Sequence, residues 1–351
     1  MVLGEFMKKS EIGKHGTGLL FKAGLVSALL IFAGAYFAVY VAPVHATEMN
    51  AGYVSGCVLN PNLFVATAIA MAPSGSYAYV TSPSGGESIV VVNTETKTVS
   101  NVIPLGSASS PFGVAFTPNG TYAYVGNQGS GSFLGNVLVI NTGTGKVVRS
   151  INNIYSPHAV AIAPSGKYAY VYGELPPGQF LNGRWTNTYL YGIVIVNITS
   201  NKLVGIIQNL GGGITGIAFS PDGAYAYATV ITGFYGYVDI INTTTGEVVG
   251  KVENSAGNGA ASIVSPNGVA FSSDGSRAYV VSLYGQFLSE PSVYVIDTST
   301  NRVIGGITQQ TYSAGSLVEP TGIATLPDST LAYVSNRMGD WVTIINTLLP
   351  S

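Results

Sequence analysis

Chemistry in this chain depends on very few side chains, and His158 is the first of them. It is the only histidine after residue 46, and it stands in the segment Ser156-Pro157-His158-Ala159. A histidine can transfer protons or bind a ligand near neutral pH, so His158 is the candidate catalytic residue. The structural alternative is a polar residue that fills a variable position between a loop and a strand.

The sequence lacks the residue sets of the common cofactor and catalytic sites. Cys57 is the single cysteine, so neither an internal disulfide nor a haem-attachment motif is available. Zinc-binding spacings are missing, and a Ser-His-Asp triad would have to use His158. We therefore expect no cofactor and no metal, and we favour a protein that is not an enzyme.

Aromatic and Phe-Leu pairs recur in the longer segments between strand signals. We predict that they form a platform for a partner protein or a glycan, because aromatic rings dominate such contacts. The alternative is that the rings fold back and cap the core. The candidate binding residues are Phe133, Phe180, Arg184, Trp185, Phe234, Tyr235, Phe287 and Trp341.

Three sequons offer sites for a different chemistry, N-glycosylation. Their acceptor residues are Asn119, Asn197 and Asn242, each followed by the required x-Thr. Asn and Thr are also favoured by the polar turns in which these segments fall, so the sequons have a purely conformational alternative.

Six copies of one repeat supply the elements that must position these side chains. Each copy has an apolar alternating stretch, a Pro-x-Gly-type turn, a Tyr-Ala-Tyr-Val-type stretch and a Val-rich stretch ending in Asn-Thr or Asp-Thr. A repeat of about 50 residues with four strand signals is typical of propeller blades. The turns lie at Pro73, Pro118, Pro164, Pro221, Ser273 and Pro327.

The second copy shows how each segment predicts a strand. Residues 113–117 alternate and predict the innermost strand, A, and residues 122–125 predict strand B. The apolar residues 136–140 predict strand C, and residues 146–151, where charge alternates with Val and Ile, predict an outer strand D. We predict an all-β, six-bladed propeller of four-stranded blades over residues 47–351.

The repeat resembles the YVTN family of β-propeller repeats, which is common in archaeal and bacterial surface proteins. Tyr79-Val80-Thr81-Ser82, Tyr124-Val125-Gly126-Asn127 and Tyr333-Val334-Ser335-Asn336 come close to the tetrapeptide of that name. The resemblance covers roughly residues 50 to 351. It implies the propeller fold, and because members of the family differ in activity it implies no mechanism.

The two ends of the repeat region predict how the ring closes. The sixth copy stops after its third strand signal at residues 341–347, and residues 51–58 form a strand signal without a blade. Pairing the two completes the last blade and removes an exposed sheet edge. Effective concentration favours this pairing within one chain. Exchange of the strand between molecules would instead build a surface filament or an S-layer.

Residues 1–46 predict a signal peptide or an uncleaved signal anchor. Lysines precede residues 23–44, which carry no charge, and Val44 and Ala46 place small residues where a signal peptidase reads them. As a helix this uncharged segment would span about 33 Å, enough to cross a bilayer. Either reading places the propeller outside the cell, and the uncleaved one anchors it in the membrane.

Composition and loop pattern lead to the functional prediction. Charged residues make up 9% of the chain and the net charge is −2, so nucleic acid is not an expected partner. In a propeller the A–B and C–D turns, here short, share one face, and the B–C and D–A loops, here long, share the other. We predict a secreted or cell-surface, non-catalytic binding or structural module that contacts a surface protein or glycan through the loop face. The enzyme alternative is a lactonase-like hydrolase that uses His158 and carboxylates at the channel mouth.

Overall fold

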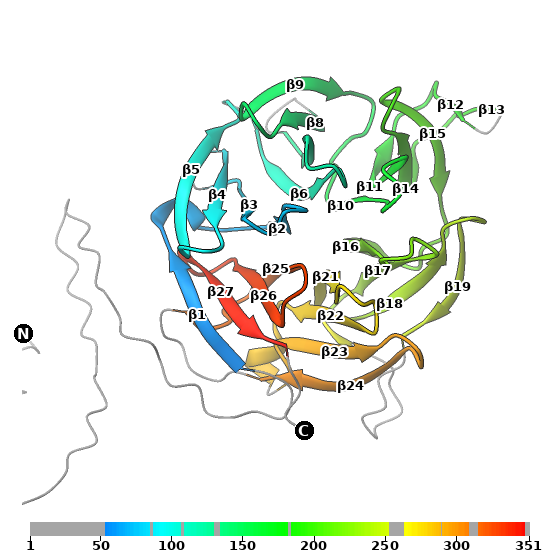
Figure 1. The fold of residues 1–351 in the computed structure, drawn as a ribbon. Coiled ribbons are helices and arrows are strands. Elements are labelled where there is room, and N and C mark those ends of the chain that lie inside the picture. The colour runs from blue at the N-terminus through cyan, green and yellow to red at the C-terminus, as the bar shows by residue number, and fades with distance from the viewer. Residues whose placement is uncertain are drawn as a thin grey trace, which may run out of the picture. The chain divides into compact units, whose positions relative to one another are not determined.

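The protein folds as six antiparallel sheets arranged around a central axis (Figure 1). The computed structural model describes residues 53–347 except 85–86, 107–108, 130–133, 182–183, 253–262, 289 and 309–314. The predicted all-β, six-bladed propeller of four-stranded blades is confirmed. The described residues include no helix that is long and apolar enough to cross a bilayer. The predicted leader, residues 1–46, lies outside the described residues.

In each blade the strands run in order from strand A at the axis to strand D at the rim. Blade 1 comprises β2 Ala68–Met71, β3 Tyr77–Ser82, β4 Ser88–Asn93 and β5 Thr98–Pro104. Blade 2 comprises β6 Pro111–Phe116, β7 Tyr122–Asn127, β8 Asn136–Asn141 and β9 Lys146–Ile151. Blade 3 comprises β10 Val160–Ile162, β11 Tyr168–Leu175, β14 Leu190–Asn197 and β15 Lys202–Ile207, with a small hairpin of β12 Phe180–Leu181 and β13 Arg184–Trp185 between its B and C strands.

The remaining blades follow the same plan. Blade 4 comprises β16 Gly213–Phe219, β17 Tyr225–Thr232, β18 Tyr235–Asn242 and β19 Glu247–Lys251, and β20 Ile263–Val264 adds to the start of β18. Blade 5 comprises β21 Pro266–Phe271, β22 Arg277–Ser282, β23 Val293–Asp297 and β24 Arg302–Ile307, with the 3₁₀ turn η2 Gly285–Leu288. Blade 6 comprises β25 Pro320–Thr325, β26 Leu331–Asn336, β27 Trp341–Asn346 and β1 Tyr53–Leu59, which is followed by η1 Pro61–Leu63.

Burial along the strands follows from this stacking. Strand C of blade 2, β8, is buried along its length until Asn141, because it lies between two neighbouring sheets. Strand D of the same blade, β9, is exposed except at Ile151. The apolar C segments and the mixed D segments of the sequence therefore mark the inside and the rim of the ring.

Aromatic pairs join successive blades across the seams. A tyrosine of strand B packs against a phenylalanine in strand A of the next blade, with ring centroids 4.7 Å apart in each case. The pairs are Tyr79–Phe116, Tyr170–Phe219 and Tyr227–Phe271. Burial raises the pKa of Tyr79 and of Tyr227 to about 12, so these hydroxyls stay neutral.

Small residues allow the A strands to approach one another at the axis. A Cβ atom on Gly113 would lie 2.6 Å from the carbonyl oxygen of His158. One on Gly268 would lie 2.7 Å from the Cα atom of Gly322. Both neighbours are backbone atoms, which cannot rotate away, so glycine at these positions sets the diameter of the ring.

The ring closes within the chain. Strand β1 pairs antiparallel with β27 from Tyr53 opposite Asn346 to Leu59 opposite Trp341, and it thereby takes the place of strand D in blade 6. In Figure 1 the first described strand, in blue, lies beside the last strand, in red. The predicted closure by residues 51–58 is confirmed for the described part of that segment.

Candidate functional site

Three consecutive residues from the start of strand A in each blade line the central channel. The first residues of these six sets occupy equivalent positions and are Thr67, Phe112, His158, Thr215, Asn267 and Thr321. The cavity has a volume of about 70 Å³. It accommodates a few water molecules and is far smaller than a typical substrate pocket of about 300 Å³ or more.

Threonines at three of these positions tie each blade to the next. Their hydroxyls donate to backbone carbonyl oxygens across the seam. The bonds are Thr67 to Pro111 at 3.0 Å, Thr215 to Pro266 at 2.8 Å and Thr321 to Ala66 at 2.7 Å. These three threonines of the channel lining therefore have a structural role.

His158 is buried in the channel, beside Gln128 and Phe112. Its Nδ1 atom lies 2.6 Å from Nε2 of Gln128, and its ring centroid lies 4.5 Å from that of Phe112. Burial lowers the pKa of His158 below its ordinary value. With the Gln128 amide donating, Nδ1 is the acceptor and the proton resides on Nε2.

The hydrolase alternative needs carboxylates beside His158, and none of the described residues supplies one by hydrogen bond. Glu174 lies within β11, where it is the strand partner of Tyr191, and its proximity raises the pKa of that tyrosine. Within the described ranges, no three His, Cys, Asp or Glu side chains are grouped so that they could bind a metal ion. Among the described residues, the side-chain hydrogen-bond partner of His158 is Gln128.

The loop face carries an ordered aromatic pair on the β12–β13 hairpin. Phe180 pairs with Trp185 across this hairpin, with ring centroids 5.3 Å apart, and the two side chains are 58% and 67% exposed. Backbone bonds of 2.7 Å from Gly178 to Thr186 and of 2.8 Å from Thr186 to Gln179 fix the hairpin base. The sequence suggested only a long insertion here, and the hairpin pairing is new.

A second aromatic cluster joins the loops of blades 4 and 5. The ring of Tyr284 lies 5.9 Å from that of Phe234 and 6.1 Å from that of Phe287. Phe234, Tyr235 and Phe287 are each more than half exposed. Tyr284 was not among the binding residues predicted from the sequence, although it lies only three residues before Phe287.

The other candidate binding residues differ in their environment. The Trp341 indole donates to the carbonyl of Ser316 at 2.8 Å, and Trp341 lies within β27, so it is part of the framework of blade 6. Arg184 lies in β13, and the structure describes its backbone. Phe133 lies outside the described residues.

The three sequon asparagines lie in short turns of the opposite face. Asn119 is in the A–B turn of blade 2, and Asn197 and Asn242 end the C strands of blades 3 and 4. In each, Oδ1 accepts from a backbone N–H of the turn at 2.9–3.1 Å. The oxygen thus stabilises the turn, and the nitrogen that a glycan would modify lies on the other side of the amide.

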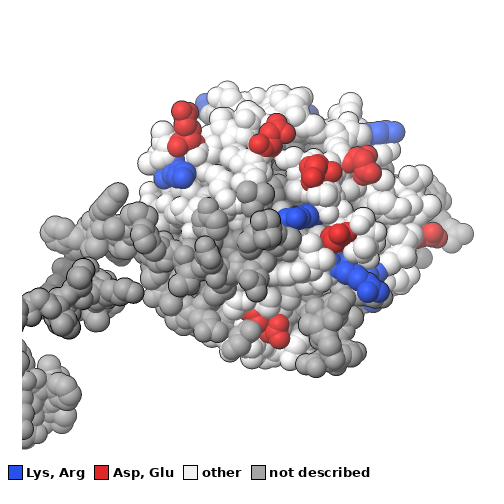
Figure 2. Space-filling view, turned by 60° about the horizontal axis from the view of Figure 1, so that its bottom comes forward, with Lys and Arg blue, Asp and Glu red and all other residues white. Residues whose placement is uncertain are grey.

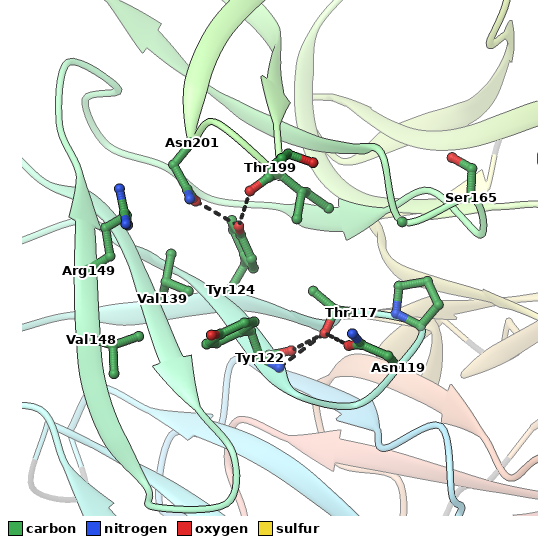
Figure 3. A pocket seen from close by; sticks show the side chains of 13 residues that line it. Thr117, Asn119, Tyr122, Tyr124, Val139, Val148, Arg149, Ser165, Thr199 and Asn201 are labelled. Atoms are coloured by element: carbon green, nitrogen blue, oxygen red, sulfur yellow. Dashed lines mark hydrogen bonds between the residues drawn. The ribbon is translucent and has the colours of Figure 1, made fainter.

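Two grooves open at the short-turn face, between blades 2 and 3 and between blades 4 and 5. Their volumes are about 640 Å³ and about 560 Å³. At the first (Figure 3), the Tyr124 hydroxyl donates to Oδ1 of Asn201 at 2.7 Å; at the second, Tyr227 donates to Asn301. Asn201 and Asn301 have φ values of 52° and 55°, a left-handed conformation that asparagine tolerates.

Charged side chains are scattered over the face that Figure 2 shows. Figure 2 shows acidic and basic side chains standing singly or in small groups among uncharged ones over the described surface. This distribution agrees with the low charge content of the sequence.

Comparisons with known proteins support the propeller fold and give no information on function. No protein-family model and no curated protein sequence matches this chain. Among solved structures, a chain of Kuenenia stuttgartiensis hydrazine synthase is similar, with a TM-score of 0.55 and 18% sequence identity. The match covers 82% of this chain and 96% of that chain. At this identity the likeness concerns the propeller fold alone.

Proposed function

We propose that this protein is a secreted or cell-surface module that binds a surface protein or a glycan through its loop face, without catalysis. The observation that carries the proposal is the Phe180–Trp185 pair, which is exposed and yet fixed by a hydrogen-bonded hairpin. Rings that are already ordered lose little conformational entropy on binding. The cluster around Tyr284 adds a second contact area.

The proposed location rests on the sequence of residues 1–46, a signal peptide or a membrane anchor. We include N-glycosylation of Asn119, Asn197 and Asn242 in the proposal. Glycans on those short turns would leave the long loops free for a partner. The low charge of the chain argues against nucleic acid as that partner.

We also propose that the chain is a YVTN-type repeat protein, because the residues that carry the resemblance have matching roles. In blade 1 the Thr81 hydroxyl donates to the carbonyl of Phe112 in the next blade. In blades 2 and 6 the last motif residue, Asn127 or Asn336, accepts from a backbone N–H of the loop before strand A, at 2.7 Å and 2.9 Å. The repeated tetrapeptide thus fastens loops and seams.

Binding of the labelled protein to intact cells of the producing organism tests the function. We expect Phe180→Ser/Trp185→Ser to weaken binding about tenfold or more, since exposed aromatic anchors dominate interfaces. The matched control is Val204→Ser/Ile304→Ser, which changes two similarly exposed apolar residues on outer strands. Wild-type affinity of the aromatic variant, or an equal loss in the control, would reject the loop face as the binding surface.

A further inference from the structure

The two grooves of the short-turn face are built from the same residue positions of different blades. Each groove takes two tyrosines from strand B, an apolar residue from strand D and an asparagine from the next blade's C–D turn. The equivalent pairs are Tyr122 and Tyr225, Tyr124 and Tyr227, Val148 and Val249, and Asn201 and Asn301. The two grooves are therefore two copies of one arrangement, and both differ from the other seams in having an asparagine at the position of Asn201.

Each groove offers an exposed apolar surface beside a flat aromatic ring. Tyr122 and Tyr225 are 37% and 43% exposed, and Val148 and Val249 are each 54% exposed. The inner tyrosine of each pair is buried and fixed by its bond to Asn201 or Asn301. The walls are therefore formed before any ligand arrives.

The rim of each groove is polar. In Figure 3, Asn119, Arg149, Ser165 and Thr199 surround the groove between blades 2 and 3. The equivalent of Asn119 in the other groove is Asp222, whose Oδ1 accepts from Ser220 at 2.6 Å and from the backbone of Ala224 at 3.0 Å. These bonds lower the pKa of Asp222, so it is a charged acceptor at neutral pH.

We propose that the two grooves are saccharide-binding sites, each receiving one pyranose ring of a neutral glycan. A sugar ring has an apolar face, which suits the exposed tyrosine, and hydroxyls at its edge, which suit amide, carboxylate and hydroxyl partners. The groove volumes fall in the range of about 300–1,000 Å³ that is usual for small-ligand sites. These sites lie on the face opposite the aromatic loops and do not depend on the proposed loop-face function.

The saccharide has two potential sources, and the grooves differ in a way that separates them. Asn119 lines the first groove and is a sequon acceptor, and the sequon of Asn197 contributes Thr199 to the same lining, so a glycan on this chain would start at the rim of this groove. Asp222 replaces it in the second groove, where no such attachment is available. A separate envelope glycan would use both grooves, whereas the chain's own glycan would fill the first alone.

Saturation-transfer NMR tests the sites with the full chain, made in a host without N-glycosylation and kept in a detergent that lacks a sugar headgroup. The probes are maltose, lactose, mannobiose and chitobiose. We expect transfer to the ring protons of at least one probe, reduced by about half in Tyr122→Ala or Tyr225→Ala and lost in the double variant, because distant sites act additively. The matched control is Tyr168→Ala, at the same strand position in blade 3 and outside both grooves.

Transfer to none of the four probes, or transfer that survives in a folded double variant, overturns the proposal. So does an equal loss in the Tyr168→Ala control. Protein from the native cells then identifies the source. If its own glycan fills the first groove, Tyr225→Ala alone removes all transfer and the added changes Asn119→Gln/Asn197→Gln restore half of it. If an external glycan is the ligand, the native and unglycosylated proteins behave alike.

Discussion

Asp239 is a residue at which burial and charge oppose each other. It lies in β18, is 2% exposed, and its Oδ1 atom has no hydrogen-bond partner. The nearest cation is the Nζ atom of Lys251, 4.0 Å away on the adjacent β19, which also lies 3.7 Å from the centre of the Tyr237 ring. Blades 1 to 3 have Val90, Leu138 and Val194 at the equivalent position.

Burial raises the pKa of Asp239, and Lys251 opposes the rise only in part. The folded state therefore retains this proton to a higher pH than the unfolded chain, which releases it near pH 4. It follows that the contribution of Asp239 to the free energy of unfolding is most favourable below about pH 4 and becomes less favourable as the pH rises through the raised pKa.

We predict that Asp239→Asn removes this fall and increases the free energy of unfolding at pH 7 by about 1–2 kcal/mol, since it removes a buried charge. Denaturant unfolding at several pH values measures the difference. The control is Asp274→Asn: turn hydrogen bonds lower the pKa of Asp274 to about 2, so its contribution is lost as the pH falls. An Asp239→Asn variant with the pH profile of the wild type would contradict this account.

At the scale of elements, the four main strands of each blade were predictable because each is bounded by its own local signal, whereas the short strands β12, β13 and β20 were not predicted. The turn at Pro118 to Gly120 and the alternation in β7 are contained in a dozen residues, and both occur as predicted. The grooves were missed because Tyr124 and Asn201 belong to different blades and meet only through packing. The contacts of Gln128 with His158 and of Trp341 with Ser316 are non-local in the same way.

The close approach of the A strands gives a prediction for Gly268. Its substitution by alanine would place a Cβ atom 2.7 Å from Cα of Gly322, and we expect a loss of about 3 kcal/mol in the free energy of unfolding from overpacking. Gly143→Ala is the control, because the nearest atom there is 3.5 Å away on the Asn141 side chain, and we expect a change within about 0.5 kcal/mol. Equal stabilities of the two variants in urea would show that the axis is not tightly packed.

For the whole molecule, closure by β1 predicts the effect of a deletion. Removing residues 53–59 exposes the edge of β27 and the core side chains under Val58, which is 1% exposed. We expect a lower midpoint of thermal unfolding and self-association through the open edge. Calorimetry and analytical ultracentrifugation measure both, and a synthetic 53–59 peptide should reverse both. A monomeric deletion variant with the wild-type midpoint of thermal unfolding would mean that the ring is stable without β1.

The pairing of β1 with β27 also links folding to the completion of synthesis. The Ser55 hydroxyl donates to the carbonyl oxygen of Ile344, 289 positions away along the chain. Strand β1 is made first, yet it has no partner until the last blade has left the ribosome, and a contact of such sequence separation forms late. A chain that is truncated anywhere before β27 cannot pair β1 with β27 and so cannot complete blade 6. It keeps an unpaired strand at its N-terminus, so the ring itself distinguishes a finished molecule from an unfinished one.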